Sequence, residues 1–203
     1  MKKGSLIILC ILLTVSVSGK VSGERSRFTY GVEWSYIGVF YSGYHYNFFA
    51  PEGYRVDPRR YGFVYDTNGE ALFHAGYEIN EKWNISLYTG ISAFEDQHLT
   101  VPISIRLSRY FKARNQGGQW LGFIDSGSGF SIKAKPQEIY AGKVGGGYRM
   151  HLSARTKLDF VASLRISYTH ADIYYDGTKI PFEKINRNNA YNSGLTIGMA
   201  LTF

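Results

Sequence analysis

Charged side chains at alternate positions inside otherwise apolar segments are the residues of this chain best placed to do chemistry. Seven of them fall on the polar face of such segments: Glu33, Glu78, Arg106, Lys143, Arg149, Asp159 and Arg165. Because acids and bases are both present, they can neutralise one another as buried ion pairs, which is how a protein interior holds charge. The same groups could instead form a path for ions if their pairs rearranged. We favour the ion-pair network.

Nucleophilic and metal chemistry has weaker candidates. The five histidines are scattered, and no two of them have the spacing of metal ligands: His45, His74, His98, His151 and His170. Ser193 is a candidate nucleophile only if a distant histidine reaches it, because its neighbours Tyr191 and Asn192 include no base. The sequence therefore predicts no catalytic residue, no metal site and no cofactor.

The segments that must position these residues alternate between apolar and polar side chains. Successive side chains of a β-strand point to opposite faces, so strict alternation indicates a strand with two different faces. The clearest case sets Leu158, Phe160 and Leu164 against Asp159 and Arg165. Eight segments show this pattern, of which the first and the fifth are less regular than the others: 28–36, 71–79, 83–92, 101–108, 120–128, 140–152, 158–167 and 195–203.

The connections between these segments are expected to alternate in length. Longer ones are predicted at 41–70, 93–100, 129–138 and 173–190, and shorter ones at 80–82, 112–119 and 153–156. Outer-membrane barrels have this asymmetry, whereas a soluble eight-stranded barrel would turn its apolar residues inward. The sequence therefore predicts an all-β fold, an eight-stranded antiparallel transmembrane up-and-down β-barrel with a filled polar lumen.

The amino terminus has the features of a secretory signal peptide. Lys2 and Lys3 precede a short apolar run and then small residues, so we expect a signal at 1–23, cleaved after Gly19 or Gly23. The barrel domain would then be 24–203. Cleavage after Gly23 removes these two lysines and Lys20 but no acid, which lowers the net charge from +7 to about +4. This charge is dispersed, so a nucleic-acid partner is not expected.

The segment 194–203 (GLTIGMALTF), which ends on Phe203, resembles the carboxy-terminal strand of bacterial outer-membrane proteins. Taken whole, the chain resembles the small eight-stranded outer-membrane barrels of the OmpA and OmpX type. The resemblance implies a multi-pass protein of the outer membrane of a Gram-negative bacterium, with both termini in the periplasm. It also implies that the barrel-insertion machinery reads Phe203. OmpA has a further periplasmic domain that binds peptidoglycan, and we expect no such wall-anchoring role here.

The first long connection holds the most suggestive surface. Many of its aromatic residues are expected to be strand ends that stand above the membrane. The remaining tip contains Tyr54, Arg55, Arg59 and Arg60. Aromatic and arginine side chains are enriched in binding surfaces, and arginine pairs well with phosphate. Lipopolysaccharide headgroups are therefore the nearest candidate partner for this tip, followed by a neighbouring membrane protein or a host protein.

These observations favour a non-enzymatic outer-membrane barrel that acts as a structural or interaction protein through its extracellular loops. The main alternative is a lipid-modifying enzyme. Lipid A deacylase barrels have a His-x-Ser pair near the last strands, but here His170 is followed by Ala171 and Asp172. A narrow channel is the third hypothesis. The fold alone does not choose among these roles.

Overall fold

The computed structural model describes residues 26–94, 98–111, 118–132, 138–170 and 173–203. The expected signal peptide and both of its cleavage points lie outside these residues. So do parts of the connections around 95–97, 112–117 and 133–137. Within the described residues, no helix is long and apolar enough to cross a membrane.

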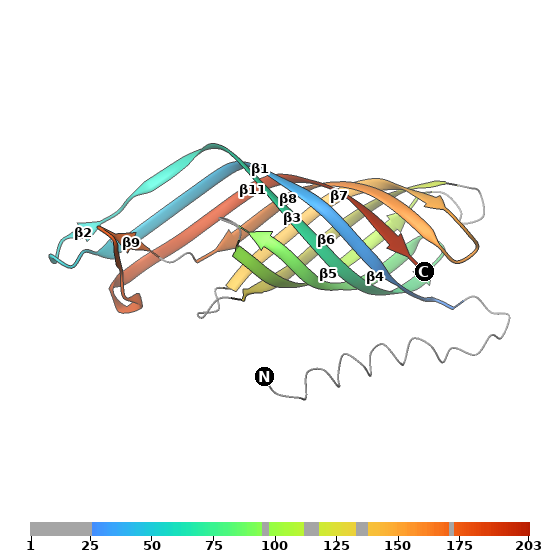
Figure 1. The fold of residues 1–203 in the computed structure, drawn as a ribbon, viewed down its shortest axis with the longest axis horizontal. Coiled ribbons are helices and arrows are strands. Elements are labelled where there is room, and N and C mark those ends of the chain that lie inside the picture. Colours follow the sequence, from blue (N-terminus) through green and yellow to red (C-terminus); the bar gives the residue numbers. More distant parts are fainter. Residues whose placement is uncertain (1–25, 95–97, 112–117, 133–137, 171–172) are drawn as a thin grey trace, which may run out of the picture.

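Eight long antiparallel strands form a closed ring (Figure 1). They are β1 (Phe28–Phe49), β3 (Arg59–Asn80), β4 (Trp83–Phe94), β5 (His98–Tyr110), β6 (Gln119–Ser131), β7 (Glu138–His151), β8 (Lys157–Thr169) and β11 (Ile185–Thr202). Each strand pairs with the next along the chain, and β11 pairs with β1 to close the ring. The predicted fold, an eight-stranded up-and-down barrel, is confirmed.

Alternation of side chains explains why the sheet closes around a polar interior. On β11, the outward Ile197 is 64% exposed, whereas the inward Ala200 next to Met199 is 2% exposed. On β8, Leu164 points outward and Arg165 points inward, and the same parity runs through the other strands. A one-residue slip of register would turn every charged side chain toward lipid. The alternation therefore fixes the register as well as the faces.

The seam between the first and last strands is made by regular pairing. Trp34 lies opposite Met199, and Gly31 lies opposite Thr202. At its end, Phe203 donates its backbone N–H to the carbonyl of Tyr30, and Tyr30 donates to Phe203 in return. The two rings stack with their centroids 5.7 Å apart. Phe203 is therefore an outward residue of the seam, at the end of the barrel where the short turns lie.

The predicted lengths of the connections are only partly right. The turns at 81–82 and 152–156 are short, as expected, but the connection at 95–97 is also short. The strands β1, β3 and β11 are much longer than predicted, so most of 41–70 and the last residues of 173–190 are strand rather than loop. The sequence pattern did not predict these strand extensions, because residues that stand above a membrane need no strict alternation of apolar and polar side chains.

These three long strands project beyond the ring as an extension of the same sheet (Figure 1). We call residues 41–49 of β1, 59–69 of β3 and 185–191 of β11 the projecting sheet. The strand β4 begins to pair with β3 only at Glu70, which lies opposite Ser92. Two small elements lie at the far end: β2 (Arg55–Val56), which pairs with β1, and the hairpin of β9 (Tyr174–Tyr175) and β10 (Thr178–Lys179). A 3-10 turn (Phe182–Lys184) precedes β11.

Candidate functional site

The lumen is filled by ion pairs, of which the largest group centres on Arg106. Its Nη1 lies 2.6 Å from Glu33 Oε2, its Nη2 lies 3.0 Å from Glu33 Oε1, and its Nε lies 3.1 Å from Asp125 Oδ2. The guanidinium carbon also lies 4.1 Å from the ring centroid of Tyr88 and 4.4 Å from that of Phe123. Arg106 therefore has two carboxylates and two aromatic faces around it.

A second group lies nearer the projecting sheet and centres on Glu70. One of its carboxylate oxygens accepts from Lys143 Nζ, and Oε2 lies 3.2 Å from Arg165 Nη1. The Glu70 side chain is only 2% exposed. Since a carboxylate buried in this way needs compensation, the two cations from β7 and β8 stabilise it from one side of the ring.

Two further pairs lie toward the short turns. Arg149 Nε and Nη2 each lie 2.6 Å from an oxygen of Asp159, which is the paired geometry that arginine forms with carboxylates. The guanidinium also lies 4.4 Å from the ring centroid of Tyr110. Nearby, Lys157 Nζ lies 3.0 Å from Glu78 Oε1. Both pairs are at most 8% exposed.

The structure places all seven charged residues expected in the lumen there, and it adds three that the sequence reasoning missed. The additions are Glu70, Asp125 and Lys157. Among the described residues, the buried charges are then five acids and five bases: Glu33, Glu70, Glu78, Asp125 and Asp159 against Arg106, Lys143, Arg149, Lys157 and Arg165. In the described part of the chain, the lumen thus holds equal numbers of opposite charges.

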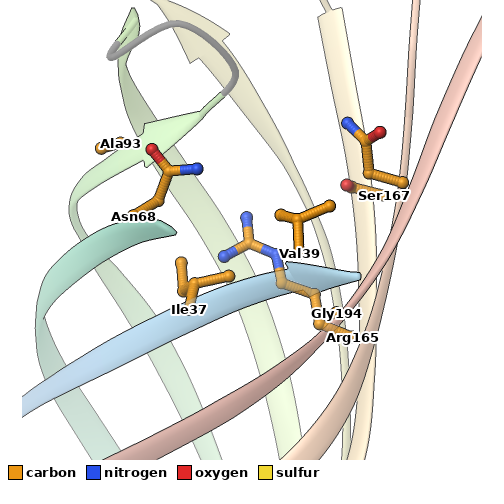
Figure 2. Close-up of a pocket in the computed structure, with 8 residues that line it drawn as sticks. Ile37, Val39, Asn68, Ala93, Arg165, Ser167 and Gly194 are labelled. Carbon is orange, nitrogen blue, oxygen red and sulfur yellow. The ribbon is translucent and has the colours of Figure 1, made fainter. Parts of the chain in front are cut away.

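Little space remains between these side chains. One cavity of about 20 Å³ lies where Arg165 of β8 approaches Ile37 and Val39 of β1, with Asn68 on the far side (Figure 2). Another of similar volume lies among the lumenal side chains around His74. Each is large enough for about one water molecule and too small for a column of water. The described part of the lumen is a plug.

The far end of the projecting sheet has a small hydrophobic core of its own. Phe48, Ile173 and Ile180 are each 2% exposed and pack together, with Val56 and Ile185 against them. The β9–β10 hairpin supplies part of this core. Its turn residues Asp176 and Gly177 have positive φ angles of 48° and 73°, as a tight two-residue hairpin requires. We call these residues, together with 50–58, the tip.

The four residues expected to form a binding surface lie at or beside the tip, and three of them have partners within the chain. The Tyr54 hydroxyl shares a hydrogen bond with the Tyr175 hydroxyl, which raises the pKa of Tyr54 to about 12. Arg55 Nε donates to Asn47 Oδ1 over 3.0 Å, and Arg59 Nη2 lies 3.2 Å from Asp57 Oδ2. Arg60 is exposed on β3.

A histidine on β1 holds the base of this surface. His45 Nε2 lies 2.7 Å from Asp57 Oδ1, and its Nδ1 lies 3.2 Å from Arg187 Nη1. The hydrogen bond from His45, together with Arg59, holds the pKa of the Asp57 carboxyl below its ordinary value. Sequence reasoning did not connect His45 with the tip, because the two residues meet only when β1 and the following loop fold back on each other.

The outer face of the projecting sheet is strongly aromatic. Phe63 is 87% exposed and Tyr65 is 86% exposed, while Tyr61 stacks on Tyr191 with the ring centroids 5.8 Å apart. Exposed apolar groups in such a row are characteristic of an interaction surface or a membrane interface.

The arrangement around the candidate nucleophile does not resemble a catalytic site. Ser193 lies opposite Tyr41 on one side and Ile166 on the other, and neither can act as its base. The Nδ1 atom of His170 is hydrogen-bonded to the backbone carbonyl of Asn188. Within the part of the chain that the structure describes, no cluster of three or more His, Cys, Asp or Glu side chains could hold a metal ion.

No family model and no curated protein matches this sequence. Among solved structures, the outer membrane protein OprG from Pseudomonas aeruginosa superposes with a TM-score of 0.52 at 8% identity, over 91% of this chain and 99% of OprG. Neisserial surface protein A aligns at 13% identity over 88% of this chain and 98% of its own, with a TM-score of 0.47. The outer membrane protein AlkL aligns at 10% identity over 91% and 94%, with a TM-score of 0.49. The closed ring of eight antiparallel strands and the likeness to OprG show that this chain has the fold of the small eight-stranded outer-membrane β-barrels of the OmpA and OmpX type.

Proposed function

We propose that this protein is a non-enzymatic interaction barrel of the Gram-negative outer membrane. In this proposal the short turns and both termini face the periplasm, and the projecting sheet stands outside the cell. The fold supports an outer-membrane location. The plugged lumen argues against a transport role, because its charges are already paired and its cavities hold about one water molecule each.

The observation that carries the proposal is the projecting sheet with its own buried core. Three strands run past the ring, and Phe48, Ile173 and Ile180 pack the tip into an ordered platform. A barrel needs no such platform to close or to stay in a membrane. Surfaces that bind partners gain affinity when they are ordered beforehand, because less conformational entropy is lost on binding.

The tip offers chemistry for an anionic, sugar-rich partner. Arg59 and Arg60 are both exposed at the start of β3, where successive side chains point to opposite faces of the strand. Arginine forms paired hydrogen bonds with phosphate. In this proposal the projecting sheet stands on the side of the membrane that carries the phosphorylated headgroups of lipopolysaccharide. We therefore assign lipopolysaccharide as the first partner of the tip. A neighbouring membrane protein or a host protein could bind the aromatic outer face at Phe63 and Tyr65.

A binding experiment with matched variants tests this assignment. Protein purified in detergent would be titrated with lipopolysaccharide, with the double variant Arg59→Gln/Arg60→Gln beside the control Arg27→Gln/Arg155→Gln at the other end of the barrel. His45 still holds Asp57 in the first variant, so the tip should stay folded. We expect binding to weaken at least fivefold in the first variant alone. Equal binding by both variants would refute the assignment.

A second measurement tests the absence of catalysis. The masses of lipid A from cells with and without the gene should be identical. A lost or added acyl chain would overturn the non-enzymatic proposal and favour a lipid-modifying enzyme.

A further inference from the structure

The lipid-facing wall of the barrel contains an apolar groove of about 920 Å³. It runs across five neighbouring strands, β6, β7, β8, β11 and β1, from Trp120 at one end to Trp34 at the other. We call it the furrow. With strands about 4.8 Å apart, four steps give a length of about 19 Å, comparable with the ~15 Å depth of one leaflet's hydrocarbon.

The floor of the furrow is made by two small outward residues that lie directly opposite each other, Gly146 of β7 and Ala162 of β8. On the next strand, the bulky Ile197 of β11 lies opposite Ala162 and bounds this part of the floor. A Cβ atom added to Gly146 would lie 3.0 Å from the carbonyl oxygen of Leu121, so the backbone itself forms part of the floor. Two small residues with bulky residues on the neighbouring strands leave a hollow in the lipid-facing wall.

Aromatic rings form one side wall and one end wall. Tyr148 and Trp120 pack edge to face with their centroids 5.2 Å apart, and Phe160 lies opposite Tyr148 on the next strand. The ring of Phe111 covers Gly122, since a Cβ atom there would lie 3.5 Å from the ring. Phe111 therefore closes the furrow at its Trp120 end.

A charged side chain lies just beyond that end wall. Arg109 points outward from β5, with its guanidinium carbon 5.8 Å from the ring centroid of Phe111 and 5.4 Å from that of Trp83. It is one residue from the end of β5, at the level of the short turns. An outward arginine is tolerated near a membrane interface but is strongly destabilising at the midplane, so Arg109 marks the interface.

The furrow slopes from this interface into the membrane. At the end near Arg109 it begins close to the turn between β5 and β6. Its floor at Gly146 and Ala162 is five residues from the short-turn ends of β7 and β8. At its far end, Tyr36 is eight residues from the start of β1. An acyl chain that descends from a headgroup at the interface follows the same slope.

We propose that the furrow binds one anionic phospholipid of the leaflet that faces the short turns, with Arg109 on its phosphate and one acyl chain along Gly146 and Ala162. The proposal rests on the membrane embedding assigned under the proposed function. It gives the lipid wall a selective site, in addition to the general contact that every membrane barrel has with lipid. Trp83 and Phe111 hold the Arg109 side chain at the mouth of the furrow.

Native mass spectrometry of the detergent-purified protein tests this site. The protein would be incubated with equal amounts of phosphatidylglycerol and phosphatidylethanolamine, and retained lipids counted. We expect one phosphatidylglycerol per barrel. Arg109→Gln should lower its retention at least fivefold, and Ala162→Trp should do the same by filling the floor.

Two matched controls separate the furrow from general effects of the same substitutions. Arg155→Gln removes a charge from a short turn at the same end of the barrel, and Ala75→Trp enlarges an outward alanine between Tyr30 and Leu87 on β3. Both should retain the lipid. Equal retention by Arg109→Gln and the unsubstituted protein, or by Ala162→Trp and Ala75→Trp, would overturn the proposal. If the barrel folds and its tip binds lipopolysaccharide, such a result refutes the furrow alone. A chain that never folds in detergent refutes both proposals.

Discussion

Arg106 and Glu33 are joined by two hydrogen bonds across the lumen, from β5 to β1, although 73 residues separate them in the sequence. Neither strand is a neighbour of the other in the ring, so this pair ties together two walls that backbone hydrogen bonds do not connect. The pair therefore braces the barrel from inside, while the ladders of the sheet hold it around the circumference.

Glu33→Gln should destabilise the barrel by about 3–5 kcal/mol, because Arg106 loses one of its two buried carboxylates. The free energy of unfolding, measured by urea titration of protein in detergent micelles, checks this expectation. Glu81→Gln, in the exposed turn after β3, is the control and should change stability little. A Glu33→Gln variant as stable as this control would contradict the bracing role.

Arg149→Ala should destabilise the barrel more than Arg165→Ala. The first change leaves Asp159 without both of its 2.6 Å bonds, whereas the second leaves Glu70 with Lys143. Unfolding in urea would show the order, and planar bilayer recordings would show no steady conductance for either. Steady conductance with unchanged stability would favour the channel hypothesis.

Leu164→Arg should cost about 2–4 kcal/mol of unfolding free energy, because Leu164 faces lipid well inside the barrel wall. Leu152 is equally exposed but lies in the turn after β7, so Leu152→Arg should cost only about 0–1 kcal/mol. Unfolding in lipid vesicles measures both. Equal losses would show that the outward band is not embedded as proposed.

The order of the tip should depend on pH through Asp57. The pKa of its carboxyl is lowered in the folded state, so its contribution is present above the ordinary value of 3.8 and is lost as the pH falls through the folded pKa. An NMR titration between pH 6 and pH 2 should show the signals of Asp57 shifting below pH 3.8. In His45→Gln the Asp57 carboxyl should titrate closer to 3.8.

Phe203→Asp should impair assembly in cells more than stability in vitro. The ring faces outward and stacks on Tyr30, so the lumen is untouched, but the seam loses an aromatic pair that we expect the insertion machinery to read. Phe203→Tyr should be tolerated because it keeps a ring at the interface. Normal amounts of the Asp variant in outer-membrane fractions would show that Phe203 has no such role.

The sequence predicted the fold because lipid and a narrow lumen demand opposite chemistry on alternate residues. For the neighbours Leu164 and Arg165, the sequence alone is enough to assign the first to the lipid-facing side and the second to the lumen. The lumenal residues Glu70 and Asp125, which the sequence reasoning missed, lie where this alternation is less regular. The sequence pattern predicts a loop at Glu70, because residues 59–69 of β3 are not alternately apolar. Asp125 lies on a strand rich in glycine and serine.

The contacts at the tip could not be predicted from local sequence patterns, for a different reason. Tyr54 meets Tyr175 from 121 residues away, and His45 meets Arg187 from 142 residues away. Such pairs depend on which loops the barrel brings to the same end, and on how far β1 and β11 run past the ring. The sequence marked the tip as basic and aromatic, but it did not show that much of this chemistry is already used within the chain.

The balance of charges inside the ring also bears on how the chain folds. Several of its ion pairs join distant parts of the sequence, with 73 residues between Glu70 and Lys143, 79 between Glu78 and Lys157, and 95 between Glu70 and Arg165. In a partly assembled sheet, carboxylates would already be losing contact with water before their cationic partners are in place. Bringing together residues this far apart in the sequence also has a cost in conformational entropy. Half-built intermediates are therefore disfavoured, and the barrel should fold and unfold as a single cooperative unit.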